Sequence, residues 1–163
     1  MHNKVVFHAA KALGELGWPV LRFNFRGVGE STGSYSEGIG EQEDARAALD
    51  FLQADRVVMA GFSFGSRVGI TVGADDDRVA ALCGIGLPVE HGRLDAIERC
   101  TKPKLFVQGS LDQFGPPGAM NAWFERVSEP KQLVWIEGAD HFFTGYQEPL
   151  KAAITSYFGA LRV

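Results

Sequence analysis

The sequence alternates between two hydrophobic periods, and this alternation restricts the fold more than any other feature. Short apolar runs, typical of buried strands, form one of the two patterns. In the stretches between these runs, hydrophobic residues recur every three to four positions, which is the spacing of amphipathic helices. Apolar strands that alternate with helices are typical of a parallel sheet covered by helices on both faces. We therefore predict an α/β fold with a mostly parallel sheet of about five strands. The predicted strands are 20–25, 56–60, 80–87, 104–109 and 132–136.

Composition limits both the size of the fold and its partners. With 163 residues, 45% of them hydrophobic, the chain is long enough for one sizeable core, so we predict a single domain over 1–163. The formal net charge of -4 provides no basic surface for nucleic acid or anionic lipid. No apolar run approaches the length of a membrane span, and the first residues do not resemble a signal peptide. We expect a cytoplasmic protein that acts on a small-molecule substrate, without nucleic-acid or membrane partners.

The sequence indicates neither a metal site nor a cofactor. The four histidines are scattered, and the two cysteines form no C-x-x-C pair or Cys/His cluster. Three consecutive aspartates at 75–77 lack the glycine and glutamate of a calcium loop, and we interpret them as a solvated turn. The glycine-rich stretch 26–31 lacks the lysine of a phosphate-binding loop, so we interpret it as a loop near the functional site.

Chemistry is expected beyond the carboxyl ends of the strands, where ligands bind in open parallel sheets. GFSFG at 61–65 follows the second predicted strand and matches G-x-S-x-G, a sharp strand-to-helix turn that projects a serine hydroxyl. Asp112 follows the fourth strand and His141 the fifth. A serine hydroxyl needs an adjacent base, and the base needs an orienting acid. We predict Ser63 as nucleophile, His141 as base and Asp112 as acid.

Each of these residues also has a non-catalytic interpretation. Asp112 could cap the following helix, His141 could be a surface loop histidine, and Ser63 could be a small residue in a tight turn. Their order along the chain, each after the appropriate strand, favours the catalytic interpretation. Asp140 is the rival acid, but as the immediate neighbour of His141 it cannot easily face the imidazole ring, so Asp112 is preferred.

Two further features of the predicted site concern the substrate. The backbone N–H of Phe64, directly after the nucleophile, is expected to stabilise the oxyanion that forms on acyl transfer. Several phenylalanines flank the site and could line an apolar acyl pocket, although they could equally be ordinary core aromatics. The candidates for substrate binding are Phe62, Phe114 and Phe142.

These motifs resemble those of the α/β-hydrolase family, in particular its small lidless members similar to dienelactone hydrolases and related esterases. The resemblance runs through the whole chain and implies the same nucleophile, acid and base. The stretch between Leu87 and Lys104 is too short for the lid domain that some family members insert there. The residues that carry the resemblance are 25–31, 61–65, 109–112 and 140–142.

The resemblance breaks at the front of the chain, which implies an N-terminally truncated α/β-hydrolase fold. Family members have three strands and a glycine-bearing oxyanion loop before the helix that begins here near Asn3, and this sequence has none of them. The group that would serve as the second oxyanion donor is therefore not identified. In the family, the third of these strands lies between the counterparts of 20–25 and 56–60. Either those two strands pair directly, or another chain fills the gap. Because a gap would leave unpaired backbone groups, we expect a homo-oligomer or a start codon assigned too late.

The function that these features favour is hydrolysis of a small carboxylic ester or thioester through an acyl-serine intermediate. The missing oxyanion loop favours an alternative, a catalytically silent fold used for binding or assembly. The presence of all three residue types argues against that alternative, because a silent protein has no physical need for them together. A serine peptidase is the third interpretation, since the same chemistry can cleave amides.

Overall fold

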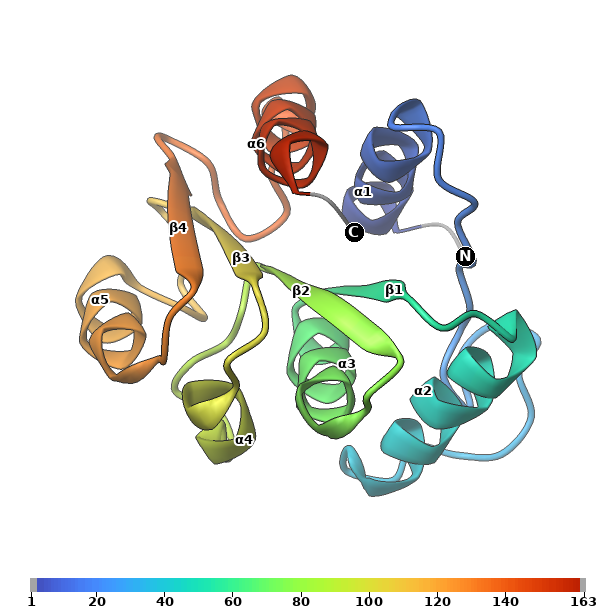
Figure 1. Ribbon diagram of the computed structural model, residues 1–163. Coiled ribbons are helices and arrows are strands. Elements are labelled where there is room, and N and C mark those ends of the chain that lie inside the picture. The colour runs from blue at the N-terminus through green and yellow to red at the C-terminus, as the bar shows by residue number, and fades with distance from the viewer. Residues whose placement is uncertain (1–2, 162–163) are drawn as a thin grey trace.

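The computed structural model describes residues 3–161, which form a parallel sheet between two groups of helices (Figure 1). One face of the sheet is covered by α1 (Lys4–Glu15) and α6 (Gln147–Ala160). The helices on the other side are α2 (Ile39–Leu52), α3 (Phe64–Asp75), α4 (Asp95–Arg99) and α5 (Pro117–Arg126). The strands are β1 (Val57–Phe62), β2 (Val79–Ile85), β3 (Lys104–Gly109) and β4 (Lys131–Ile136).

The sheet has the order β1-β2-β3-β4, and every neighbouring pair is parallel. Its four strands coincide with the last four predicted ones, which confirms the α/β class and the parallel sheet. Phe62 lies opposite Ile85, and Ile85 lies opposite Val107. The loops that follow the strands therefore meet at one edge of the sheet, the edge at which the sequence predicts the site. Between β2 and β3, residues 86–103 contain one short helix, α4, and no lid domain.

Both faces of the sheet are buried, which explains why its central strands are apolar at nearly every position. Along β2, Ala81, Cys83 and Ile85 pack against α1 and α6, whereas Leu82 packs on the opposite side with α3. The same alternation occurs on β3, where Phe106 packs against the ring of Trp123 from α5. The two cores fix the strands and so hold the loops at the carboxyl edge in place.

The first predicted strand, 20–25, is wrong: within the described residues this segment pairs with no strand. Alternating hydrophobicity predicts a backbone suited to a ladder, but a ladder also needs a neighbour about 4.8 Å away. A groove separates the segment from β1. The segment's last carbonyls turn toward the loop that follows, where Asn24 O accepts from Ser31 Oγ and Phe25 O accepts from the N–H of Val28. Of the two arrangements implied by the resemblance, direct pairing is therefore excluded.

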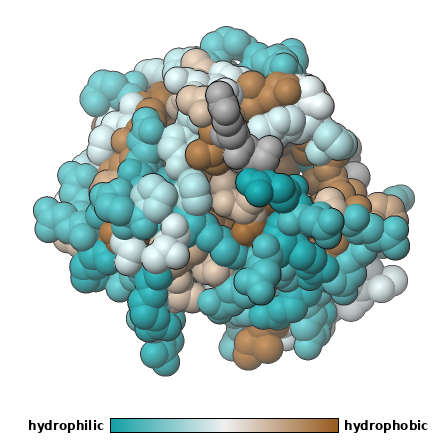
Figure 2. Space-filling model, in the orientation of Figure 1, coloured by the Kyte–Doolittle hydropathy of each residue, from teal (hydrophilic) through white to brown (hydrophobic). Residues whose placement is uncertain are grey.

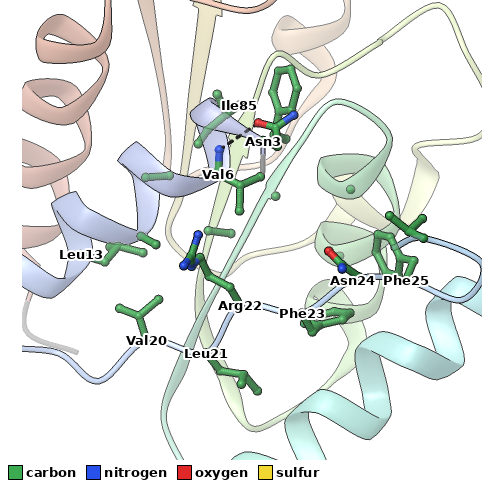
Figure 3. Close-up of a pocket in the computed structure, with 18 residues that line it drawn as sticks. Asn3, Val6, Leu13, Val20, Leu21, Arg22, Phe23, Asn24, Phe25 and Ile85 are labelled. Carbon is green, nitrogen blue, oxygen red and sulfur yellow. Dashed lines mark hydrogen bonds between the residues drawn. The ribbon is translucent and has the colours of Figure 1, made fainter. Parts of the chain in front are cut away.

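The groove between 20–25 and β1 is apolar and has a volume of about 250 Å³. Figure 3 shows Val6 and Leu13 of α1 on one side of this space and segment 20–25 on the other. Along β1, the N–H groups of Val57 and the following Ser63 donate toward β2, to Arg78 O and Ile85 O. Since successive peptide groups of a strand point to opposite sides, the alternate residues 58, 60 and 62 direct theirs toward the groove.

The surface near this groove includes exposed apolar side chains. In the orientation of Figure 1, hydrophobic patches interrupt a largely hydrophilic surface (Figure 2). Exposed apolar area is common on soluble proteins, but beside unpaired strand backbone it favours association with another chain. The exposed large hydrophobic residues of segment 20–25 and the loop after it include Val20, Phe23, Val28 and Tyr35.

Candidate active site

Ser63 occupies a tight turn between β1 and α3. Its backbone has φ 53° and ψ -124°, a conformation that residues with a side chain rarely adopt. Neighbouring contacts hold this turn: the Ser63 N–H donates to Ile85 O at 2.9 Å, and its carbonyl accepts from Ser66 Oγ at 2.6 Å. A side chain at Gly61 would collide with the backbone of Gly65 and Ser66. The glycine two residues before the serine is therefore a steric requirement of the turn.

The structure brings the three predicted site residues into one hydrogen-bonded chain. Ser63 Oγ lies 2.8 Å from His141 Nε2, and His141 Nδ1 lies 2.8 Å from Asp112 Oδ2. These side chains come from the ends of β1, β4 and β3, so the parallel sheet places them together although they are far apart in the sequence. His141 is 3% exposed and Asp112 is 1% exposed, whereas Ser63 is only partly buried. The serine is therefore the most accessible of the three side chains.

The buried carboxylate of Asp112 is hydrogen-bonded on both oxygens. Oδ1 accepts from the backbone N–H of Phe114 at 2.8 Å, and Oδ2 accepts from Gln108 Nε2 at 2.9 Å in addition to its contact with His141. Burial of an ionised carboxylate is tolerated when it has such partners. Gln108 is absent from the residues predicted for the site. Its signal in the sequence is a single amide in the otherwise apolar end of β3, four residues before the acid.

Asp140, the rival acid, has a different role. Its Oδ1 accepts from the N–H of Phe142 at 3.0 Å and from that of Thr144 at 3.3 Å. These bonds organise the turn that carries His141. Asp140 is thus the neighbour of His141 in the sequence, but the ring nitrogen Nδ1 of His141 contacts Asp112 instead.

The three phenylalanines proposed to line the site all contact the imidazole of His141. The ring centroids of Phe62, Phe114 and Phe142 lie 4.9, 4.7 and 5.2 Å from that of His141. Phe62 is buried, but Phe114 is 39% exposed and Phe142 is 56% exposed. The two exposed rings are therefore not core residues, and they lie against the imidazole that contacts the serine.

Phe64 is the first residue of α3, directly after Ser63. Its N–H is one of the first N–H groups of the helix, which have no acceptor within it and carry the positive end of the helix dipole. The position is suited to a developing negative charge. The Phe64 ring packs against Phe25 and Tyr35, so residues that flank the 26–31 loop contact the residue after the serine.

An ion pair anchors the start of that loop. Arg26 donates from its guanidinium to both oxygens of Asp44 on α2, and its backbone N–H bonds the same carboxylate at 2.9 Å. Hydrogen bonding by Arg26 holds the pKa of Asp44 below its ordinary value. The aspartate thus remains ionised near neutral pH and ties the loop to α2.

Residues 3–161 contain neither a metal-binding cluster nor a helix suited to cross a membrane. No group of three or more His, Cys, Asp or Glu side chains in this range could hold a metal ion. In the same range, no helix is both long enough and apolar enough to cross a membrane.

Comparison with known proteins decides the family. A family model described as an alpha/beta hydrolase domain matches residues 1–152. The chain belongs to the α/β-hydrolase family. This hydrolase chain is 34% identical to an uncharacterized protein of Rickettsia prowazekii, in an alignment that covers 96% of the chain and 71% of the relative.

Two solved structures, one of a serine hydrolase homologue and one of a member of the serine hydrolases, are similar to this hydrolase chain. An alpha-beta serine hydrolase homologue from Coxiella burnetii superposes with a TM-score of 0.90 at 39% identity, covering 96% of this chain and 76% of the other. A serine hydrolase without a lid from Xanthomonas campestris gives a TM-score of 0.87 at 38% identity, with coverages of 98% and 74%. Both agree with the fold described above, and the second is described as lacking a lid.

Proposed function

We propose that the protein is a serine hydrolase that cleaves a small carboxylic ester or thioester through an acyl-serine intermediate. The observation that carries this proposal is the continuous chain from Ser63 Oγ through His141 to Asp112, with both hydrogen bonds at 2.8 Å. The likeness to one protein described as a serine hydrolase homologue and to another described as a member of the serine hydrolases supports the reaction class.

In the proposed first step, Ser63 Oγ attacks the carbonyl carbon of the substrate while His141 Nε2 takes the hydroxyl proton. The oxyanion that forms accepts a hydrogen bond from the N–H of Phe64. Asp112 Oδ2 holds the Nδ1 proton of the ring and stabilises the imidazolium. Collapse of the tetrahedral intermediate breaks the bond to the leaving alkoxide or thiolate, which takes the proton from Nε2 and departs. The acyl group remains on the serine oxygen.

In the second step, His141 Nε2 removes a proton from water as the water oxygen attacks the acyl carbonyl. The new tetrahedral intermediate expels Ser63 Oγ, which regains its proton from the ring, and the carboxylic acid leaves. The exposed rings of Phe114 and Phe142 border this space and provide an apolar surface for a short acyl chain. An ester or thioester is preferred over an amide because its leaving group departs more easily.

The proposal is tested by hydrolysis of p-nitrophenyl acetate and butyrate by matched variants. We expect Ser63→Ala to reduce turnover to the background rate and Asp112→Asn to reduce kcat about 10⁴-fold, because the asparagine stabilises the wrong tautomer of the ring. Asp140→Asn is the control, since the amide oxygen can still accept the two turn N–H groups; it should retain activity within a few-fold. Wild-type protein that is folded but does not turn over these esters would favour the silent binding alternative.

A further inference from the structure

Gln108 is a fully buried amide at the end of β3, and its three hydrogen bonds fix its orientation. Oε1 accepts from the N–H of Leu87 at 3.0 Å, and Nε2 donates to Asp112 Oδ2 at 2.9 Å and to Gly115 O at 3.2 Å. An N–H needs an acceptor, and carboxylate and carbonyl oxygens need donors, so the amide cannot be flipped. All hydrogen-bonding groups of this side chain are thus directed at partners around the acid.

Gln108 Nε2 and His141 Nδ1 converge on the same oxygen, Asp112 Oδ2. The N–H of Phe114 binds the other oxygen. Three donors therefore bind the carboxylate from two sides. Two of these donors, the Gln108 amide and the Phe114 N–H, are neutral. Rotation of the carboxylate away from the imidazole would break the contact with Gln108 as well as the contact with His141.

The amide is anchored to a buried inner strand of the sheet. β3 lies between β2 and β4, and Gln108 is in register with Trp135 of β4. Through Oε1 the side chain also binds Leu87, two residues beyond β2. Gln108 thus links the loop that carries Asp112 to the segment that follows β2.

The chain also leaves space for this amide. A side chain at Gly115 would collide with Gln108 Nε2 and with the carbonyl of Leu87. The absence of a side chain at Gly115 is thus required for Nε2 to reach the carbonyl of the same glycine. This steric requirement is independent of the contact with the acid.

We propose that Gln108 is a positioning residue of the acid: it aligns Asp112 Oδ2 with His141 Nδ1 and replaces water as a donor to the buried carboxylate. The inference rests on the proposed function, because it concerns the acid of that reaction. Gln108 contacts no reacting atom and acts through Asp112 alone.

The test compares Gln108→Met, which removes both polar groups at similar size, with Lys104→Met as a matched control. Lys104 is equally buried on the same strand, but its Nζ donates to Ser128 O and Pro130 O, away from the site. We expect Gln108→Met to lower kcat about 10- to 100-fold at nearly constant KM, the scale of one hydrogen bond to a buried charge. Lys104→Met should lower thermal stability and leave the kcat of the folded protein unchanged.

A second variant, Gln108→Glu, gives a readout that loss of stability alone does not move. Two carboxyl groups that share one buried site cannot both ionise readily, so the new carboxyl group holds a proton at low pH and can donate it to Asp112 Oδ2 as the amide does. When this proton is lost at higher pH, repulsion between the two carboxylates turns Asp112 away from the imidazole. The kcat of this variant should be closest to wild type at low pH and fall relative to wild type as the pH rises, and the midpoint at which the His141 ring protonates in NMR spectra of histidine-labelled protein should differ from that of wild type. Besides Asp112, the neighbouring charged group is Asp140, whose Oδ1 is engaged in its own turn. Asp140→Asn serves as the spectral control.

The outcomes separate the two proposals. Wild-type kcat in folded Gln108→Met, or a pH profile unchanged in Gln108→Glu while the wild type hydrolyses esters, would overturn the positioning role and leave the proposed function intact. A wild type without hydrolysis would overturn the proposed function. The NMR midpoint then still decides whether Gln108 acts on His141 through Asp112, because that measurement needs no turnover.

Discussion

Gly61 and Gly14 have opposite surroundings, and only Gly61 is required by the geometry of the site. At Gly61 the backbone of Gly65 and Ser66 occupies the space of a side chain, so the turn that presents Ser63 can form only without one. Gly14, in the last turn of α1, has open space instead and no left-handed backbone. Glycine is required at the first position and merely costs helix stability at the second.

We predict that Gly61→Ala and Gly14→Ala change stability in opposite directions. Gly61→Ala should lower the free energy of unfolding by about 1–3 kcal/mol, the scale of overpacking, and should reduce hydrolysis by the folded protein. Gly14→Ala should raise it by about 0.5–1 kcal/mol. Urea denaturation followed by tryptophan fluorescence measures both. Equal tolerance of alanine at the two positions would contradict the described turn.

The three residues at the centre of the site were predictable because each follows a strand. The G-x-S-x-G turn marked Ser63, and the parallel sheet implied that Asp112 and His141 would lie at the same edge. Gln108 was not predictable in this way. It belongs to the interior of a strand, where a polar residue has no motif, and its role depends on contacts with Leu87 and Asp112 that only the packed fold creates.

At the scale of elements, the predicted turn at 75–77 is only partly correct: Asp75 is the last residue of α3, whereas Asp76 and Asp77 lie in the connection to β2. The three aspartates are also not equivalent. Asp75 and Asp77 are exposed, whereas Asp76 accepts three hydrogen bonds from Arg78, one from its backbone and two from its guanidinium. Hydrogen bonding by the Arg78 guanidinium lowers the pKa of Asp76 to about 2. This carboxylate is thus part of the connection into β2.

The lowered pKa predicts how this turn contributes to stability as the pH changes. The folded value lies below the ordinary value of 3.8, so the contribution is complete above about pH 4 and is lost as the pH falls through 2. We expect Asp76→Asn to lower the free energy of unfolding by about 1–2 kcal/mol at pH 7, with a smaller difference from wild type at pH 2.5.

Urea denaturation at both pH values measures this effect, and the exposed neighbour provides the control. Asp77→Asn should match the wild type at either pH. A constant difference between Asp76→Asn and wild type over the whole range would show that the carboxylate contributes nothing through its charge.

Segment 20–25 illustrates what hydrophobic pattern cannot predict about an element. The alternation of its residues is that of a strand, and the pattern contains no information on whether a partner strand lies within hydrogen-bonding distance. Here the groove separates the segment from β1. The four strands that were correctly predicted differ from it in having partners, from β1 through β4.

At the scale of the whole molecule, one side of β1 pairs with no strand among residues 3–161, and this feature has consequences beyond one chain. It combines backbone groups directed into an apolar groove with exposed apolar residues nearby, such as Val20 and Phe23. Unpaired strand edges of this kind favour association unless a charge or a covering segment blocks them. We expect the 163-residue chain to form homo-oligomers at micromolar concentration.

Light scattering coupled to size-exclusion chromatography measures this association over a range of concentrations. Ala60→Lys places a charge on the exposed position of β1 that lines the groove, and it should shift the protein toward monomer. Ala122→Lys adds the same charge at an exposed alanine of α5 and should leave the oligomer unchanged. A wild-type monomer at every concentration, or equal association of the two variants, would contradict the prediction.

The central claim, that Ser63 is an activated nucleophile, is tested most directly by covalent labelling. The folded protein is treated with a fluorophosphonate, and the modified residue is located by mass spectrometry of its peptides. We predict one phosphonyl adduct, on Ser63, that is absent in Ser63→Ala and forms more slowly in His141→Gln, because the ring must take the hydroxyl proton. Folded wild-type protein that remains unlabelled, or an adduct on another serine, would contradict it.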